Sequence, residues 1–234
     1  MRVAVLIISW PHDMRYLFEK SVWHYYMNEH EGVDCFFLEA NNDLAHGEVL
    51  ESKNHLQIGC KDNLKDGIFK KTIYALRHLK GKYDFYIRTN LSTYWRFDLL
   101  RNYLSQVKHD YFYGGWRWGD FIGGFSIILN QKSCDFLIEN AKVNEHTQIE
   151  RADDVTIGVI MRRVVPKPYK LNSQSFYWEY EDKRIEESIQ KIRSDNLFIV
   201  RTLPHWGMSW QKLIFQALLR EFECVEICLP PKAK

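Results

Sequence analysis

The sequence has few cysteines and no cysteine pattern that could organise a fold. Its 234 residues include five cysteines, an odd number, and no two of them form a CxxC motif. Structural zinc sites and disulfide frameworks are built on paired cysteines at regular spacings. The sequence therefore argues against both, and it favours reduced thiols in the cytoplasm.

Long apolar runs and blocks of basic residues are also lacking. The apolar run at the N-terminus, residues 3–9, is far shorter than the roughly 20 residues that span a membrane, and it lacks a signal-peptide cleavage site. The 32 basic residues are interspersed with 30 acidic ones, for a net charge of +2. Proteins that bind nucleic acid gather their basic residues on one face. We therefore expect a soluble cytoplasmic protein with no membrane span and no nucleic-acid partner.

Apolar strand patterns alternate with helical patterns in the first part of the chain. Residues 3–9, 34–39 and 83–88 are short apolar runs that predict buried strands. Apolar residues recur at helical spacing over residues 17–27 and again over residues 64–79. The order strand, helix, strand, helix, strand predicts an α/β fold with a central mixed sheet flanked by helices.

The second part of the chain continues this pattern less regularly. We expect helices at residues 95–107, 132–141, 153–161 and 210–221, a charged helix or connector at residues 182–193, and strands at residues 111–115 and 197–203. Residues 121–129 contain Gly123-Gly124 and then an apolar strand. Two segments have no clear period. Residues 41–61 are predicted to be a loop with a short helix, and residues 166–180 an irregular aromatic segment.

Six short motifs follow one another along the first two thirds of the chain. They are Ser9-Trp10-Pro11 with Arg15 and Trp23, Phe36-Phe37-Leu38, Asp62-Asn63-Leu64 with Lys71-Thr72, Arg88-Thr89-Asn90-Leu91-Ser92, Gly123-Gly124, and Asp153-Asp154-Val155-Thr156-Ile157-Gly158. In this order, and most specifically through the last motif, they resemble the β-1,3-galactosyltransferase and Fringe family of glycosyltransferases. The resemblance covers residues 3–165.

The resemblance implies a GT-A type, Rossmann-like fold in which residues 1–234 form a single domain. The nucleotide-sugar half would cover about residues 1–95, and the acceptor and catalytic half residues 96–234. The implied reaction moves a sugar from a UDP-type donor to a glycan or glycoprotein acceptor. Two departures, the absent membrane anchor and the replacement of the family's acidic triplet by Asn90-Leu91-Ser92, favour a distant bacterial or viral branch.

By resemblance, Asp154 is the general base of an inverting transfer, and Asp153 orients it or binds the acceptor. A simpler reading remains open, in which the two acids only cap the helix predicted at residues 153–161.

The donor-binding residues implied by the same motifs are Ser9, Arg15, Lys71, Arg88, Asn90 and Ser92. Charge on the departing diphosphate could be stabilised in two ways. In one, Mn²⁺ or Mg²⁺ binds weakly through Asn90, Ser92 and His205. The neutral oxygens of Asn90 and Ser92 are poor substitutes for carboxylates. In the other, Arg15, Lys71 and Arg88 contact the phosphates without a metal.

Aromatic residues near the glycine turn suggest a sugar-binding surface. Candidate acceptor contacts are Trp116, Trp118, Gly123, Gly124, Tyr177 and Trp178, although large aromatics commonly fill cores instead. A second function class is an inactive glycan- or nucleotide-binding module, which the missing acidic triplet favours. A nucleotidyltransferase is disfavoured, because it needs paired acids on neighbouring strands and none are found.

Overall fold

The apolar runs of the sequence form strands of one large sheet. The computed structural model describes residues 1–10, 14–63, 66–143, 152–177, 183–203 and 208–223. The large sheet contains β1 (Val3–Ile8), β2 (Val33–Ala40), β3 (Val49–Ser52), β4 (His55–Ile58), β5 (Phe85–Asn90), β7 (Tyr113–Gly115), β10 (Ser126–Asn130) and β11 (Tyr169–Lys170). Its strand order is β11-β7-β10-β5-β1-β2-β4-β3, with β1 parallel to β2 and β5, and β10 antiparallel to β5.

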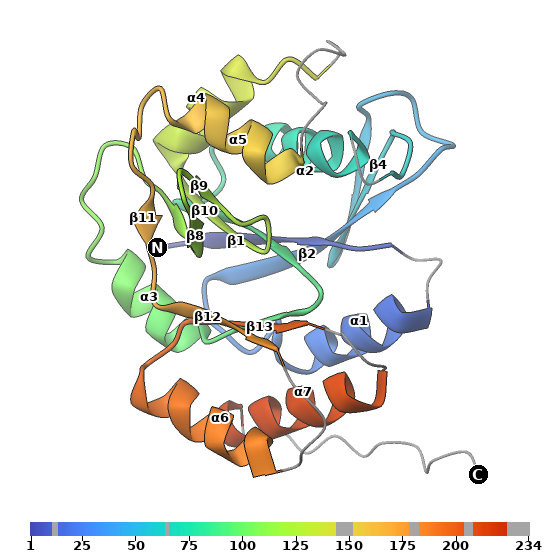
Figure 1. Cartoon of the computed structure of the whole chain (residues 1–234). Helices are drawn as coiled ribbons and strands as arrows, with labels where there is room; N and C mark the ends of the chain where they lie inside the picture. Colours follow the sequence, from blue (N-terminus) through green and yellow to red (C-terminus); the bar gives the residue numbers. More distant parts are fainter. Residues whose placement is uncertain (11–13, 64–65, 144–151, 178–182, 204–207, 224–234) are drawn as a thin grey trace.

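Alternate residues of each central strand point to opposite faces, and both faces are covered. Val3, Val5 and Ile7 of β1 join one apolar cluster, whereas Ala4 and Leu6 join the other. The apolar cluster on the first face includes α1 (Met14–Tyr26) and α3 (Phe97–Leu104) and extends to α6 (Lys183–Ser194) and α7 (Met208–Phe222). The second face packs on α2 (Gly67–His78), α4 (Gln131–Asn140) and α5 (Asp153–Met161). Figure 1 shows these two groups of helices on opposite sides of the sheet.

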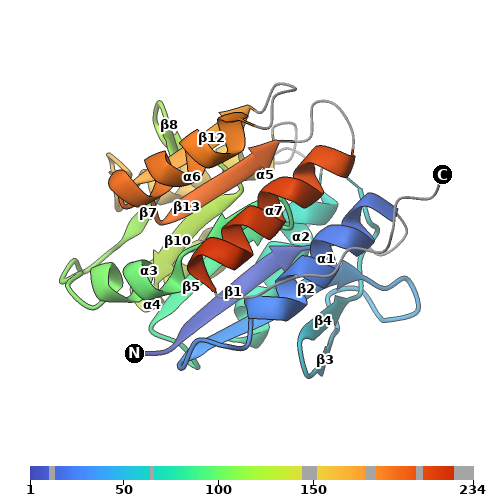
Figure 2. The same ribbon diagram turned by 90° about the horizontal axis from the view of Figure 1, so that it is seen from below.

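A smaller sheet lies between the large sheet and the helices α6 and α7 (Figures 1 and 2). It consists of β6 (Thr93–Trp95), β12 (Ser173–Tyr177) and β13 (Ile199–Leu203), in the order β12-β13-β6. The indole N–H of Trp95 donates to Thr89 Oγ1 at 2.9 Å and ties β6 to β5. The strands β8 (Arg117–Trp118) and β9 (Phe121–Ile122) form a separate short hairpin.

The predicted α/β class, with a mixed central sheet flanked by helices, is confirmed. Three local predictions are wrong. Residues 41–61 hold the hairpin of β3 and β4, whose residues 55–58 alternate between half-buried and buried as a strand does. The strand β6 occupies the start of the helix predicted at residues 95–107, because Thr93–Trp95 is buried against both β5 and β13.

The third error concerns residues 166–180, which were predicted to be irregular. They contain β11 and β12, which pair in parallel with β7 and β13. The apolar strand predicted after Gly123-Gly124 is confirmed as β10, whereas β9 precedes the two glycines and belongs to a different sheet. In the part of the chain that is described, no helix combines the length and apolar character needed to cross a bilayer.

Gly115 illustrates how tightly β7 and β10 approach each other. Its φ is +146°, and a Cβ there would lie 1.8 Å from the carbonyl oxygen of Ser126. Gly81 also has a positive φ, +77°, but a Cβ there would meet nothing within 4 Å.

We expect Gly81→Ala to lower the free energy of unfolding by about 1 kcal/mol, the cost of a left-handed backbone for alanine. Gly115→Ala should lower it by about 3 kcal/mol or more, because β7 must also move away from β10. Urea unfolding followed by circular dichroism measures both. Equal losses in the two variants would contradict the close approach at Gly115.

Candidate functional site

The carboxyl ends of the central parallel strands meet at one edge of the large sheet. Ile8, the last residue of β1, is the register partner of Leu38 in β2 and of Asn90 in β5. Both faces of these strands are buried, so polar side chains collect where the strands end. In open α/β sheets this edge is where ligands bind.

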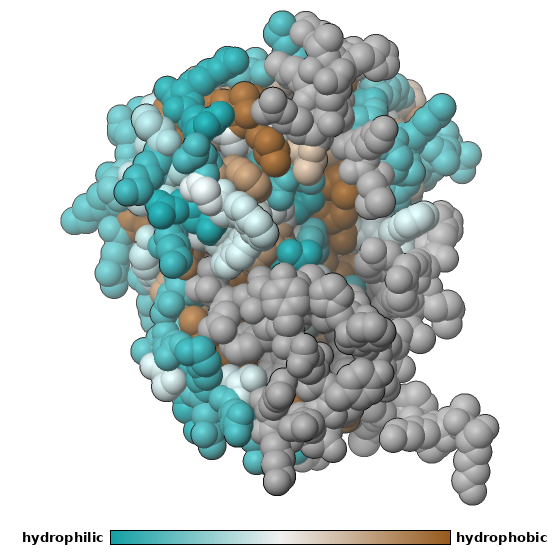
Figure 3. Space-filling view, viewed as in Figure 1, coloured by the Kyte–Doolittle hydropathy of each residue, from teal (hydrophilic) through white to brown (hydrophobic). Residues whose placement is uncertain are grey.

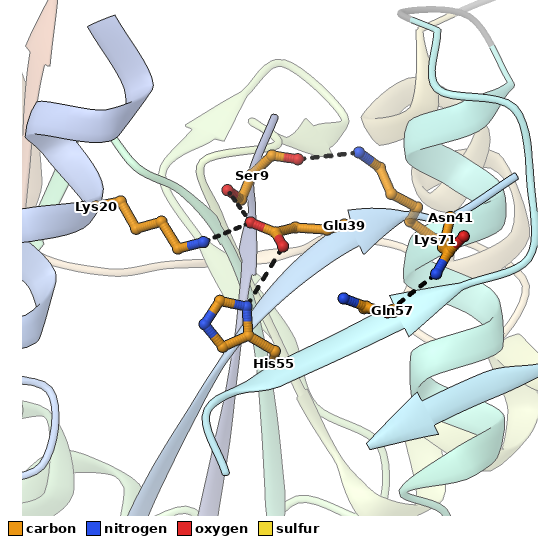
Figure 4. A network of polar contacts seen from close by, with 7 residues as sticks. All are labelled: Ser9, Lys20, Glu39, Asn41, His55, Gln57 and Lys71. Carbon is orange, nitrogen blue, oxygen red and sulfur yellow. Dashed lines mark hydrogen bonds and ion pairs between the residues drawn. The ribbon is translucent and has the colours of Figure 1, made fainter. Parts of the chain in front are cut away.

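The first polar group at this edge is centred on Glu39, near the end of β2 (Figure 4). One carboxylate oxygen accepts hydrogen bonds from Lys20 Nζ at 2.6 Å and from Ser9 Oγ at 3.1 Å. The other lies 3.3 Å from His55 Nδ1. Burial alone would raise the pKa of Glu39, but Lys20, His55 and Ser9 together lower it below its usual value. Glu39 therefore remains charged and joins β1, β2, β4 and α1.

Lys71 connects the same strand end to α2. Its ammonium group donates to the carbonyl oxygen of Ser9 at 3.2 Å and to Asp62 Oδ1 at 2.8 Å, as Figure 4 shows for Ser9. The side chain is almost fully buried. Two of the predicted donor-binding residues, Ser9 and Lys71, are thus in direct contact.

The second polar group joins β5 to the start of α5. Arg88 Nη2 donates to Asp153 Oδ2 at 2.6 Å, and both side chains are buried. Burial raises the pKa of Asp153 above its usual value, and the charge of Arg88 acts in the opposite direction. Arg88 was predicted to contact phosphate. In the structure its guanidinium has a protein partner, and the phosphate contact stays a prediction.

Asp154 lies beside this ion pair and is only half-buried. Its Oδ2 accepts the backbone N–H of Gly124 at 3.0 Å, and its Oδ1 accepts the N–H of Val155 at 2.8 Å. A carboxylate offers about four acceptor positions, so lone pairs remain on both oxygens. The structure thus brings together four predicted residues: Arg88, Gly124, Asp153 and Asp154.

Asn90 and Ser92 lie at and just beyond the end of β5, and both are half-buried. The carbonyl oxygen of Ser92 accepts hydrogen bonds from the backbone N–H and the hydroxyl of Thr202, each at 2.9 Å. This contact brings the carboxyl end of β13 to the same edge. Within the described ranges no three His, Cys, Asp or Glu side chains are grouped as metal ligands. The predicted ligand His205 lies outside those ranges.

The predicted aromatic surface is partly exposed. Trp118, on the β8–β9 hairpin, is 63% exposed, and its ring centroid lies 5.3 Å from that of Trp116. Trp116 is half-buried and packs on Phe125 and against Gly123, where a Cβ would lie 2.9 Å from its ring. In the space-filling view, brown apolar side chains reach the surface among teal polar ones near the middle of the molecule (Figure 3).

The remaining predicted residues are placed only in part. Arg15 lies in the first turn of α1, and Tyr177 ends β12 as the register partner of Leu203 in β13. Their side chains are not among those described. Trp178 lies outside the described residues.

Sequence reasoning missed Glu39 and its partner Lys20. Glu39 was interpreted only as the end of a strand. The signal available in the sequence was an acid at the end of an apolar run that was predicted to be a buried strand. A carboxylate in such a position needs a cationic partner.

The fold is similar to that of the apo form of the glycosyltransferase GlyE from Streptococcus pneumoniae TIGR4, with a TM-score of 0.52 and 12% sequence identity over 95% of this chain and 61% of that one. The chain therefore spans less than two thirds of GlyE. A galactosyltransferase, LgtC, in complex with donor and acceptor sugar analogues, gives a TM-score of 0.49 at 13% identity, covering 91% and 95% of the two chains.

The fold is thus of the GT-A type, as the motifs predicted. No protein-family model and no curated protein matches the sequence. Membership of the β-1,3-galactosyltransferase and Fringe family stays a prediction.

Replacing Glu39 tests the polar group at the end of β2. Glu39→Gln should lower the free energy of unfolding by about 2 kcal/mol at pH 7, because Lys20 loses a buried ionic partner. The pKa of Glu39 is lowered by folding, so its contribution is present above the usual value of 4.5 and is lost as the pH falls below it. The difference between variant and wild type should therefore shrink in acid, as measured by urea unfolding at several pH values.

Glu51→Gln is the matched control. Glu51 pairs with His78 at 2.7 Å but is 40% exposed, so its loss should cost less than about 1 kcal/mol. The role assigned to the charge of Glu39 would be contradicted if Glu39→Gln lowered the free energy of unfolding no more than Glu51→Gln does. It would also be contradicted if the effect of Glu39→Gln did not depend on pH.

Proposed function

We propose that this protein is a glycosyltransferase that moves a sugar from a nucleotide-sugar, of the UDP type, to a hydroxyl group of a glycan. The GT-A-type fold shared with GlyE supports this proposal. So does the concentration of polar groups at the carboxyl edge of the sheet, around Ser9, Asn90 and Asp154.

The observation that carries the proposal is the environment of Asp154. Two backbone N–H groups orient the carboxylate at the start of α5, and it keeps partial exposure beside the glycine turn. We propose that it accepts the proton of the acceptor hydroxyl. The acceptor oxygen then bonds to the anomeric carbon while the bond from that carbon to the phosphate oxygen breaks, and the nucleoside diphosphate leaves with the electron pair. Attack opposite the leaving group inverts the anomeric configuration.

The donor would lie across the ends of β1 and β5, between Ser9 and Asn90. Lys71 is a cation in direct contact with Ser9, although Asp62 already offsets its charge. Asn90 and Ser92 would be the described ligands of Mn²⁺ or Mg²⁺, but neutral oxygens fit these ions poorly. We therefore derive no step of the transfer through a metal. The acceptor would lie toward Trp118, whose exposed ring can stack on a sugar face.

An inactive binding module is the second candidate. The observation that favours it is the absence of carboxylates at Asn90 and Ser92, where many nucleotide-sugar enzymes hold a metal. It shares the donor site with the first candidate but lacks turnover, so binding and transfer have to be measured separately.

Titration calorimetry with UDP and a panel of UDP-sugars tests the donor site, once with Mn²⁺ and once with EDTA. We expect micromolar binding. Binding that survives EDTA supports phosphate contacts by cations, and binding that requires Mn²⁺ supports a metal held near Ser92. No binding under either condition would overturn the donor assignment.

Asp154→Asn tests the chemical role. The variant should bind the donor within twofold of wild type, but UDP release from UDP-sugars in the presence of glycan acceptors should fall by about 100-fold or more. Asp110→Asn is the matched control, because the carboxylate of Asp110 is exposed and forms an ion pair with Lys132, away from the candidate site. Full activity of Asp154→Asn would overturn its role as the base. No release by the wild type, with donor binding intact, would favour the binding module.

A further inference from the structure

Arg88 and Asp153 form an ion pair inside the protein, between β5 and α5. The two charged atoms are 2.6 Å apart, and the side chains are 4% and 10% exposed. Removing two charges from water is expensive, and apolar pairs of similar volume are often equally stable or more so. Stability alone is therefore a weak reason for this pair.

The guanidinium of Arg88 also lacks a full set of partners. Among the described residues, its buried Nε–H has no hydrogen-bond acceptor. A buried donor without a partner is destabilising. Hydrogen bonding of all its donors therefore does not explain where the guanidinium lies. The groups that its Nη atoms contact explain its position better.

Those groups lie on both sides of Asp154. Arg88 Nη2 contacts Asp153, the residue that precedes Asp154 in the chain. Arg88 Nη1 packs against Gly124, where a Cβ would lie only 2.4 Å away. Gly124 in turn donates its N–H to Asp154 Oδ2. One guanidinium therefore supports both the first turn of α5 and the backbone donor that orients the carboxylate.

We propose that Arg88 and Asp153 are positioning residues that set the orientation of Asp154, rather than a phosphate ligand and a second catalytic acid. The inference rests on the proposed function of Asp154 as the base. It explains why Gly124 has no side chain, since any side chain would displace Arg88. It also explains why two adjacent acids tolerate each other, because the charge of Arg88 neutralises the buried one.

Neutralisation matters because Asp153 and Asp154 repel each other. Burial and the charge of Asp154 both raise the pKa of Asp153, and Arg88 opposes them. Replacing Arg88 would remove the ion pair that joins Asp153, in the first turn of α5, to β5. It would also remove the charge that lowers the pKa of Asp153, so that Asp153 would bind a proton more readily.

The test measures the orientation of Asp154 separately from the stability of the protein and from its catalytic activity. The key variant is Arg88→Met/Asp153→Leu, which removes both charges and fills the space with apolar groups. Arg88→Lys keeps the charge but not the forked geometry. Arg162→Met is the control, because Arg162 is also on the α5 segment and pairs with Asp120 at 3.4 Å, but in an exposed position.

Three quantities are measured for each variant: the free energy of unfolding, the pH dependence of the Gly124 amide signal by NMR, and kcat and KM for UDP release. The Gly124 signal should titrate with Asp154 in the wild type. In the double variant we expect wild-type stability, a Gly124 titration amplitude reduced by at least half, and a kcat lowered about tenfold or more with KM within twofold. Arg88→Lys should be intermediate, and Arg162→Met unchanged.

A stable double variant with a wild-type Gly124 titration and kcat would overturn the proposal, because the ion pair would then be dispensable for the site. A double variant that fails to fold would leave Arg88→Lys to decide by the same Gly124 signal. Absence of UDP release in the wild type would overturn the proposed function alone, since the Gly124 signal reports the orientation of Asp154 in an inactive protein as well.

Discussion

Burial of both faces of β1 and β5 is the constraint on which the rest of the structure depends. In a strand that is covered on both faces, a polar side chain lies at the strand end or is paired with another polar group in the interior. Ser9 and Asn90 take the first option. Arg88 takes the second, through Asp153 on the helix that covers it. The polar edge and the buried ion pair thus have the same physical origin.

The two polar groups at this edge differ in how they are built. The group at Glu39 joins three strands and a helix through a carboxylate held by several donors, and it leaves little free hydrogen-bonding capacity. The group at Arg88 holds one carboxylate inside and presents the next one, Asp154, with lone pairs to spare. The first group is rigidly held, whereas the second keeps a carboxylate available to a ligand. The strand β1, which pairs with both β2 and β5, lies between the two groups.

Much of the fold could be predicted from residue patterns, because β1 and β5 begin with continuous apolar runs and α2 has a clear helical period. The strand β6 could not, since its three buried residues acquire their environment from β13, about a hundred positions later. The pairing of Arg88 with Asp153 was hidden for the same reason: a cation in an apolar run shows that a partner is needed, but not which one. Gly124 packs against Arg88 and donates its N–H to Asp154, and these two contacts show that the motifs at residues 88, 124 and 153 form one unit.

The small sheet makes completion of this edge depend on a segment far along the chain. Ser92 and Thr202 are separated by 110 positions, and β6 has no strand partner among the described residues except β13. Contacts over such distances close large loops and form late in folding. During synthesis, the central strands can pair before β13 has left the ribosome. Thr93–Trp95 can pair with β13 only after residues 199–203 have emerged, and the edge beside Asn90 is complete only then. Residues 199–203, far along the chain from the first strands, thus set the time at which the polar edge at the ends of those strands is complete.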